Sequence, residues 1–462
     1  MQARFARTYL LDSGSALACG SLVRNDVDGM GAVKTFVWNA LSQAEKKTAL
    51  ARPRFKDDAA VLRDVNAIVS AVKTRGDAAL REFAAKFDGG APATLRLTPE
   101  ELAKAAASVA PELRAAMIQA KANIEAFHKA EMPHPVKVET MPGVMCELQW
   151  RPMETVGIYI PGGTAPLFSA VLMLAIPARI AGCRRVVLCT PPKAGEIHPA
   201  ILAAAELCSI TEIYASGGAQ AIAALAYGTE SVPKCDKVFG PGNAYVTMAK
   251  QLVAQDADGA AIDMPAGPSE VMVIADNTAK AAWVAADLLA QAEHDTVAQA
   301  ILVTTDAEFA QQVEGEVTAQ LAKLSRRSIA EQSIAESRII IVVDRAAAIE
   351  VANSYAPEHL IIHHEDAATW VPEIQHAGSV FVGAWTPESA GDYASGTNHV
   401  LPTYGYARAY NGVNLLSFMK SMSVQTITRE GLQKLGPTIV TMAEAEGLDA
   451  HAGAVKIRME SK

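Results

Sequence analysis

The 462-residue sequence has no block of basic residues and no long hydrophobic run. It contains 41 Lys and Arg against 50 Asp and Glu, and this acidic balance is unfavourable for binding nucleic acid or an anionic membrane surface. Its most apolar stretch, residues 170–176, is followed by Pro177 and Arg179 and is far shorter than the ~18–20 residues that span a bilayer. We therefore expect neither nucleic acid nor a membrane as a partner.

The sequence also lacks a Cys-x-x-Cys pair, which argues against a structural zinc ribbon and a thioredoxin-like site. A chain of this size needs no disulfide bonds to hold its fold. We expect reduced thiols in a cytoplasmic protein, with Cys183 and Cys189 buried as small hydrophobic side chains beside the apolar segment 186–188. The cysteines are Cys19, Cys146, Cys183, Cys189, Cys208 and Cys235.

Residues 1–34 have neither the sustained apolar segment nor the small-residue cleavage site of a secretory signal. We expect a mobile N-terminal extension over these residues, with Met30 as an alternative start. The helical pattern over residues 36–51 predicts a small helical element within residues 35–58.

The rest of the chain alternates between helical and strand patterns. Apolar residues at helical spacing cover residues 57–87 and 99–131, and Thr98 with Glu101 forms a capping-box signature. Short β-rich segments separated by helix-like segments are typical of βαβ units and parallel sheets. The first series comprises 156–160, 185–189, 212–215 and 237–239, and the second comprises 271–275, 300–304, 338–343, 360–363 and 379–382. Two doubly wound sheets are predicted, followed by a loop over 384–412 and a helical tail over 413–462.

Glycine-rich turns follow three strands of the first series, at residues 161–163, 216–220 and 240–243. Ligands of open α/β sheets bind beyond the carboxyl ends of the strands, so we expect the informative residues directly after the strands. Such turns let a phosphate approach the amides that open the next helix. The Gly-x-Gly-x-x-Gly fingerprint of dinucleotide-binding domains is absent. The three turns therefore indicate only a phosphate or nucleotide cleft, and plain strand-to-helix connections are the alternative.

Polar candidates accompany the second series of strands. Gln291 and His294 share one helix face, where they are either metal ligands or part of a solvated helix end. Glu358 and His359 stand at a junction between a turn and a strand, where they are either a general-base pair or a surface pair.

Further candidates lie near the C-terminus. Asp392 and His399 occur in a long Gly- and Ser-rich loop, and such loops are more often functional than not, so both are candidate ligands or substrate contacts. Glu446 and His451 lie in the tail, where solvated helix positions are a strong alternative.

Six motifs together resemble those of the histidinol dehydrogenase family. Their order, spacing and number are specific, and the resemblance extends from about residue 36 to near the C-terminus. The motifs are GIYIPGG at 157–163, FGPGN at 239–243, DMPAGPSE at 263–270, QAEH at 291–294, PEHL at 357–360 and GDYASGTNH at 391–399.

The resemblance implies an α/β fold of two incomplete Rossmann-like, doubly wound parallel-sheet domains with helical N-terminal and C-terminal appendages. It implies an NAD-binding domain over residues 159–268 and a discontinuous catalytic domain over residues 59–158 and 269–412. The tail, residues 413–462, would cross to the partner of a homodimer with shared active sites.

The resemblance also implies a reaction, the last step of histidine biosynthesis. L-Histidinol would be oxidised through L-histidinaldehyde to L-histidine, with two NAD⁺ reduced, one water consumed and one Zn²⁺ in each subunit. The implied general bases are Glu358 and His359. The implied zinc ligands are Gln291, His294, Asp392 and His451. The implied NAD⁺ contacts are Tyr159, Gln220 and Asn243. The substrate would contact the four zinc ligands, Ser269, His359 and Glu446.

Other functions stay open at the level of the sequence. A dehydrogenase of the same fold could oxidise another amino or sulfonated alcohol, although Glu446 together with Ser269 favours histidinol. A catalytically silent protein could bind only a nucleotide or a metal, although the intact candidate residues argue against it. A covalent thiohemiacetal on Cys146 or Cys183 is a less economical route for the same oxidation.

Overall fold

The computed structural model describes residues 33–53, 58–88, 90, 94–162, 166–193 and 195–461. By internal contacts the chain divides into two compact units. Of the described residues, unit 1 comprises those within 33–53 and 269–386, and unit 2 comprises those within 58–268 and 387–461. The extension predicted over residues 1–34 lies outside the described residues, except for residues 33 and 34.

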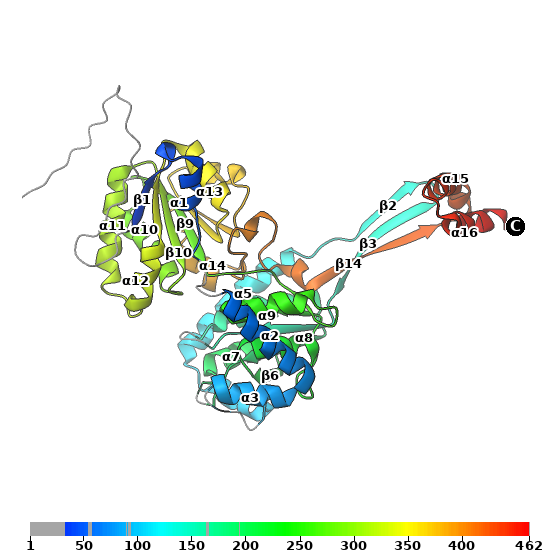
Figure 1. Cartoon of the computed structure of the whole chain (residues 1–462), viewed down its shortest axis with the longest axis horizontal. Helices are drawn as coiled ribbons and strands as arrows, with labels where there is room; N and C mark the ends of the chain where they lie inside the picture. Colours follow the sequence, from blue (N-terminus) through cyan, green and yellow to red (C-terminus); the bar gives the residue numbers. More distant parts are fainter. Residues whose placement is uncertain are drawn as a thin grey trace, which may run out of the picture. The chain divides into compact units, whose positions relative to one another are not determined.

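Unit 1 is built on a six-stranded parallel sheet with strand order β1-β11-β10-β9-β12-β13. Successive residues of β9 face opposite layers: Val271 and Val273 pack with α10, α11 and α12, whereas Met272 and Ile274 pack with α1 and α13. The second predicted series is thus confirmed as a doubly wound sheet (Figure 1). The strands are β1 (Lys34–Val37), β9 (Glu270–Ala275), β10 (Gln299–Thr304), β11 (Arg338–Ile341), β12 (His359–His363) and β13 (Ser379–Val382). The helices are α1 (Gln43–Ala49), α10 (Ala281–Ala292), α11 (Ala307–Leu321), α12 (Arg327–Glu336) and α13 (Arg345–Tyr355).

Unit 2 contains a five-stranded parallel sheet with order β6-β5-β4-β7-β8. In β4, Ile158 packs with α5, α6 and α7, and Tyr159 packs with α2, α3, α8 and α9, so helices cover both faces. The strands are β4 (Thr155–Tyr159), β5 (Arg185–Thr190), β6 (Glu212–Ala215), β7 (Lys237–Phe239) and β8 (Ala261–Ile262). The helices are α2 (Asp58–Arg75), α3 (Asp77–Phe87), α4 (Pro99–Ala107), α5 (Pro111–Ala130), α6 (Phe168–Ala181), α7 (Pro199–Leu207), α8 (Gly218–Tyr227) and α9 (Ala244–Gln255). The capping box predicted from Thr98 and Glu101 opens α4.

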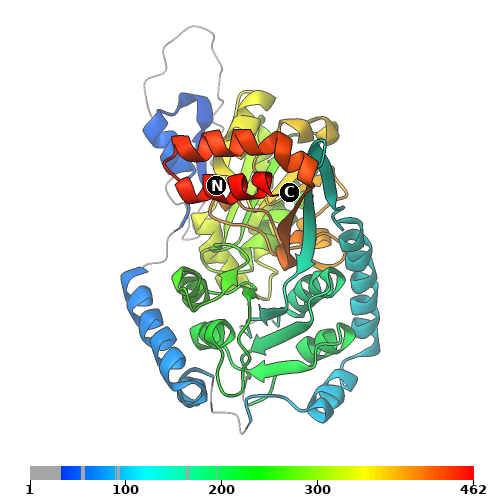
Figure 2. The same cartoon turned by 90° about the vertical axis from the view of Figure 1, so that its right-hand side faces the viewer.

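Unit 2 also carries a three-stranded antiparallel ribbon, in the order β14-β3-β2. It consists of β2 (Val136–Met141), β3 (Val144–Pro152) and β14 (Met419–Ile427). Two helices, α15 (Arg429–Ala445) and α16 (Asp449–Glu460), lie side by side beyond the ribbon (Figures 1 and 2). The prediction of a purely helical tail over 413–462 is therefore wrong, because residues 419–427 pair with a strand more than 260 residues earlier in the chain.

Two local predictions also need correction. Residues 34–37 form the edge strand β1 beside β11, so the predicted helical element is confined to the short helix Trp38–Ala40 and to α1. The predicted loop over 384–412 contains the helix α14 (Glu388–Tyr393). The remaining 3₁₀ helices are Ala367–Thr369, Val371–Glu373, Tyr406–Arg408 and Leu415–Phe418. By contacts residues 59–158 belong to unit 2, and the functional division into an NAD-binding and a catalytic domain stays a prediction.

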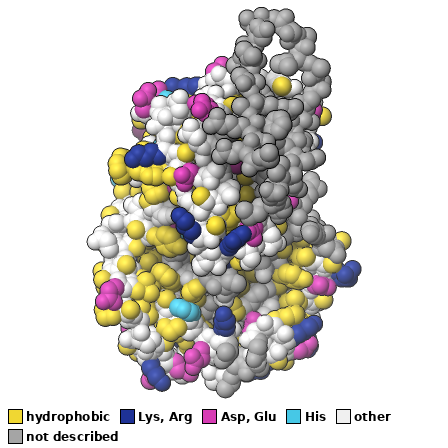
Figure 3. Space-filling view, turned by 90° about the vertical axis from the view of Figure 1, so that its left-hand side faces the viewer, with side chains coloured by type: hydrophobic (Ala, Val, Ile, Leu, Met, Phe, Trp, Pro, Cys, Tyr) yellow, Lys and Arg dark blue, Asp and Glu magenta, His cyan; other side chains and the backbone are white. Residues whose placement is uncertain are grey.

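The helix lengths, the thiols and the surface charges of the described residues are those of an ordinary globular protein. Every helix among the described residues is too short or too polar to cross a bilayer. The five cysteines within the described ranges form no disulfides, and burial raises the pKa of the Cys208 and Cys235 thiols to about 12. Acidic and basic side chains are interspersed on the face seen in Figure 3. A cytoplasmic location stays a prediction from the sequence.

Candidate functional site

The predicted bases lie at the amino-terminal edge of the unit 1 sheet. Glu358 precedes β12 and His359 begins it, while Ser269 precedes the neighbouring strand β9, whose first residue is Glu270. These candidates thus precede their strands, whereas the residues that directly follow strands were expected to be the informative ones. These residues converge because β9 and β12 are parallel neighbours, so their first residues share one edge.

Both bases are held by the main chain of Glu270. The carboxylate of Glu358 accepts a hydrogen bond from the Glu270 N–H at 2.8 Å, and Nδ1 of His359 lies 3.1 Å from the Glu270 carbonyl oxygen. A carbonyl oxygen can only accept, so Nδ1 carries a proton, and in the neutral ring Nε2 holds the lone pair. Glu358 and His359 are 5% and 4% exposed, which overturns the alternative of a surface pair.

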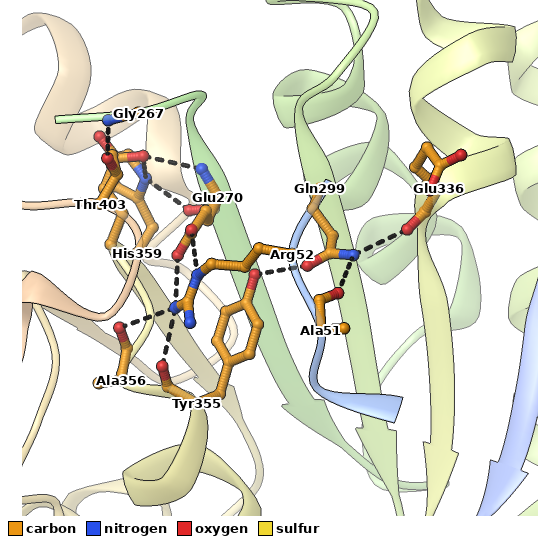
Figure 4. Close-up of polar contacts among 11 residues, drawn as sticks. Ala51, Arg52, Gly267, Glu270, Gln299, Glu336, Tyr355, Ala356, His359 and Thr403 are labelled. Atoms are coloured by element: carbon orange, nitrogen blue, oxygen red, sulfur yellow. Dashed lines mark hydrogen bonds and ion pairs between the residues drawn. The ribbon is translucent and has the colours of Figure 1, made fainter. Parts of the chain in front are cut away.

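The Glu270 side chain is itself part of a buried polar network (Figure 4). Its carboxylate pairs with both Nε and Nη2 of Arg52, a bidentate geometry in which the Nη2–Oε2 distance is 2.9 Å. On the side of Arg52 away from Glu270, the Tyr355 hydroxyl donates a hydrogen bond to the Gln299 amide oxygen at 2.7 Å. Sequence reasoning missed both Arg52 and Glu270 as site residues, although Glu270 adjoins the predicted Ser269.

Helix α10 presents a second group of candidates in unit 1. Gln291 is fully buried, and neither its amide oxygen nor its amide nitrogen has a hydrogen-bond partner among the described residues. An amide left in that state is costly unless a ligand completes it. Asp287 lies one turn earlier, and burial raises the pKa of its carboxyl to about 7. The alternative of a solvated helix end therefore fails for Gln291, whereas His294 is exposed just past the helix.

In unit 2 the candidate NAD⁺ contacts lie at the carboxyl edge of the five-stranded sheet, as expected. Tyr159 ends β4 and Asn243 follows β7, on either side of the point where the strand order reverses. The Tyr159 hydroxyl accepts from the N–H of Gly218, whose φ of +62° favours glycine. Gly218 begins α8, and Gln220 is buried in the first turn of this helix. The amide oxygen of Asn243 caps α9 by accepting from Tyr245 and Val246, so only its amide N–H₂ remains for a ligand.

Asp88 is a further titratable residue beside these contacts, and sequence reasoning missed it. Burial raises the pKa of its carboxyl to about 6, although hydrogen bonds from the Gly217 N–H and the Gln220 side chain act in the opposite direction. Asp88 follows α3, far in sequence from the glycine-rich turns. A lone Asp after an amphipathic helix carries no signal that separates it from surface residues.

The remaining candidates lie in unit 2. Asp392 is half-buried on α14, and Nδ1 of His399 lies 2.7 Å from the Asp392 carbonyl oxygen, which fixes the loop after this helix. Glu388 is buried one turn before Asp392 on the same helix face, and its i, i+4 spacing from Asp392 could have identified it. Glu446 and His451 are both exposed, at the end of α15 and in the first turn of α16.

Comparisons with known proteins agree on one family. The family model described as histidinol dehydrogenase matches residues 51–459. The histidinol dehydrogenase of Vibrio cholerae is 55% identical over 428 residues, which cover 93% of this chain and 99% of the relative. The enzyme of Salmonella typhimurium is 54% identical, with 92% and 97% covered. The crystal structure of histidinol dehydrogenase from Elizabethkingia anophelis is 48% identical with a TM-score of 0.90, covering 94% of this chain and 99% of that one.

Proposed function

Because this chain belongs to the histidinol dehydrogenase family and is an NAD-dependent oxidoreductase of histidine biosynthesis, we propose that it oxidises L-histidinol to L-histidine through L-histidinaldehyde at a zinc site. The observation that carries the proposed mechanism is the main chain of Glu270, which holds Glu358 by its N–H and His359 by its carbonyl. Proton transfer needs groups held in this way, with the reacting atom oriented before the substrate arrives.

His359 acts as the base in both oxidations. Its Nδ1 proton is directed at the Glu270 carbonyl, so Nε2 is the atom that accepts the hydroxyl proton of L-histidinol. Once that proton has passed to solvent, the same atom accepts a proton from the hydrated aldehyde in the second oxidation. Imidazole suits this task because it titrates near neutral pH.

Glu358 acts between the two oxidations. Its carboxylate takes a proton from the water that adds to the aldehyde carbon. Because Glu358 and His359 are both buried, bulk water has little access to this edge of the sheet, and the reactive aldehyde is protected until that addition.

The proposed zinc ligands are Gln291, His294, Asp392 and His451. The buried Gln291 amide oxygen, which has no partner among the described residues, supports this assignment, and nitrogen and oxygen donors of these types suit zinc. When bound, zinc would hold the imidazole and amine nitrogens of histidinol and orient its alcohol carbon. Ser269 and Glu446 are the further proposed substrate contacts.

The carboxyl edge of the unit 2 sheet is the proposed NAD⁺ site, and NAD⁺ supplies the hydride acceptor. The glycine backbone at Gly217 and Gly218 opens α8 and suits the close approach of a phosphate. Tyr159, Gln220 and Asn243 surround the reversal point of the strand order, where nucleotides bind in sheets of this class.

A homodimer with shared active sites is the proposed assembly. All but one residue of β2 is exposed, including Val136 and Val138 at about half of their maximal exposure. Met442 and Ile457 on the tail helices are exposed by 62% and 67%. Exposed apolar side chains on the ribbon and the tail helices favour a covering surface. A second copy of the chain would cover it and would receive Glu446 and His451.

Chelation and reconstitution test this function. The purified protein would be stripped of metal, loaded with Zn²⁺ and assayed for NADH formation with L-histidinol and with other amino alcohols. We expect zinc-dependent NADH formation that is fastest with L-histidinol. Faster turnover of another alcohol would reassign the substrate, and zinc or NAD⁺ binding without turnover would show a silent binding protein. A Cys146→Ser, Cys183→Ser double variant should keep its activity, because no thiol takes part in the proposed route.

A further inference from the structure

Arg52 contacts both Glu270, whose main chain holds the proposed bases, and the end of helix α13, just before Glu358 (Figure 4). Its Nη2 donates to the Glu270 carboxylate at 2.9 Å, and Glu270 begins the strand β9. The same nitrogen lies 2.7 Å from the Tyr355 carbonyl oxygen and 3.3 Å from that of Ala356, at the end of α13. Glu358 is only two residues beyond Ala356. One guanidinium therefore joins β9 to the end of α13 at the amino-terminal edge of the unit 1 sheet.

Both contacts of Arg52 reach buried residues. Ala356 is buried and has a φ of +55°, a left-handed conformation that residues other than glycine rarely adopt. The side chain of Glu270 is 3% exposed, and a carboxylate in that position needs a partner charge. Arg52 supplies this charge and also donates to the carbonyls of Tyr355 and Ala356. Its guanidinium lies 3.8 Å from the centroid of the Tyr355 ring.

Arg52 is itself held in place from its own segment. The Gln299 side chain donates to the Ala51 carbonyl at 3.3 Å and to the Glu336 carbonyl at 2.8 Å. Gln299 also accepts a hydrogen bond from the Tyr355 hydroxyl. Ala51, which precedes Arg52, and Tyr355, whose ring lies against the Arg52 guanidinium, therefore belong to one network. The approach of Arg52 to Glu270 is therefore fixed by contacts to strand β10 and, through it, to the ends of helices α12 and α13.

We propose that Arg52 is a positioning residue of the reaction, acting through Glu270 on both Glu358 and His359. The inference rests on the proposed function of these two bases. The guanidinium fixes the Glu270 carboxylate on one side and the last carbonyls of α13 on the other. The Glu270 N–H and carbonyl then fix the Glu358 oxygen and His359 Nδ1. Lysine could not replace it fully, because an ammonium lacks the planar fork that pairs with a carboxylate and reaches the carbonyls as well.

Arg345 is a control with the same kinds of partner in a more exposed ion pair, since its side chain is 35% exposed and that of Glu373 is 53% exposed. It begins α13, whose other end carries Tyr355. Its Nη2 donates to the Glu373 carboxylate and to the Thr369 carbonyl at 2.7 Å, and its guanidinium lies 4.9 Å from the Trp370 ring centroid. Arg345 thus has the same kinds of partner as Arg52, at the carboxyl edge of the sheet.

The experiment compares R52Q and R52K with R345Q and R345K in the zinc-loaded enzyme. For each we would measure kcat, the KM for L-histidinol, the zinc content and the thermal midpoint. We expect R52Q to lower kcat about 10- to 100-fold with full zinc content and less than about a threefold change in KM, because the bases lose their alignment. R52K should fall between R52Q and the wild type. R345Q and R345K should lower the thermal midpoint yet keep kcat within about twofold.

A kcat loss in R52Q no larger than that in R345Q, at matched thermal midpoints, would overturn the proposal, as would full kcat in R52K. If R52Q does not fold, the double variant R52Q/E270Q removes both buried charges. We expect it to fold and to keep a low kcat, and normal turnover in it would count against the positioning role.

A second measurement separates this inference from the proposed function. In ¹⁵N-histidine spectra, the His359 signals would be identified by their loss in H359N. The wild type should show a single neutral tautomer with its proton on Nδ1, and R52Q should show a mixture. If the wild type does not oxidise L-histidinol, the proposed function fails. An unchanged tautomer in R52Q would instead show that the positioning role fails.

Discussion

Gln291 and Asp88 share a physical feature at the residue scale: each is a polar side chain held where water has little access. The Gln291 amide is fully buried without a hydrogen-bond partner among the described residues, and burial raises the pKa of the Asp88 carboxyl to about 6. Such groups cost stability and are found mainly where a ligand or a reaction uses them. They therefore support Gln291 as a proposed zinc ligand and the carboxyl edge of the unit 2 sheet as the proposed nucleotide site.

Replacing Asp88 with asparagine should stabilise the protein more at neutral pH than in acid. The folded state keeps the Asp88 proton up to about pH 6, whereas the ordinary value is 3.8, so the unfolded chain binds fewer protons between these values. The wild type therefore loses stability as the pH rises through this window, and the loss is complete above it. The asparagine side chain cannot ionise, so the variant avoids this loss. Thermal midpoints below pH 4 and above pH 7 test this, with a difference of the order of 2 °C emerging only at the higher pH. Equal differences at both pH values would contradict the pKa.

Glu358→Gln should separate the two halves of the reaction. Glutamine keeps an oxygen that accepts the Glu270 N–H, so the fold and zinc content should be retained. It cannot take a proton from water, so the oxidation of the aldehyde should fall about 100-fold, and that of the alcohol by much less. His359→Asn should slow both halves. Rates measured separately from L-histidinol and from L-histidinaldehyde would decide, and an equal loss in both halves for Glu358→Gln would refute water activation.

Long-range contacts explain which site residues the sequence could predict. Glu358, His359 and Gln291 stand in short motifs, so their identity was accessible. The contacts that hold Glu358 and His359 were not accessible, because they come from Glu270, which lies 88 residues before Glu358. Arg52 and Asp88 lie outside every motif and reach their partners only through the fold.

At the scale of elements, the ribbon and the tail helices differ most from the prediction. The nine strands of the two predicted series were confirmed because buried parallel strands are apolar along their whole length. Strand β14 has only two residues that are not exposed, so its sequence carries no strong pattern, and pairing with β3 decides its structure. Edge strand β1 was missed for a related reason, since it depends on β11, which lies about 300 residues later.

Gly431→Ala should loosen α15 from the ribbon. A Cβ at Gly431 would lie 2.4 Å from the Gly143 carbonyl oxygen in the turn between β2 and β3, and a main-chain atom there cannot move aside easily. We expect faster hydrogen exchange in α15 and α16, lower zinc content and at least a tenfold loss of activity, with both α/β sheets intact. Gly453→Ala is the control, because a Cβ there has nothing within 4 Å and alanine favours a helix by ~1 kcal/mol. Normal activity in G431A with a loosened tail would show that the tail does not serve the active site.

At the scale of the whole molecule, shared active sites predict complementation between two inactive chains. His451→Asn and His294→Asn chains should each be nearly inactive alone, because every site lacks one ligand. In a mixed dimer with two-fold symmetry, one site collects both lesions and the other collects neither, so about half of the wild-type activity should return. Co-expression with two tags and purification of the mixed dimer would measure this. A folded, mixed but inactive dimer would show that the tail serves its own chain.

The measurement that tests the central claim most directly is the amount of NADH formed from a limiting amount of L-histidinol. The zinc-loaded enzyme would be given excess NAD⁺, and NADH and L-histidine would be quantified at completion. In the proposed mechanism His359 is the base for two hydride transfers, and Glu358 activates water between them. We therefore expect two NADH and one L-histidine for each L-histidinol consumed. One NADH with release of the aldehyde, or no NADH at all, would contradict the account.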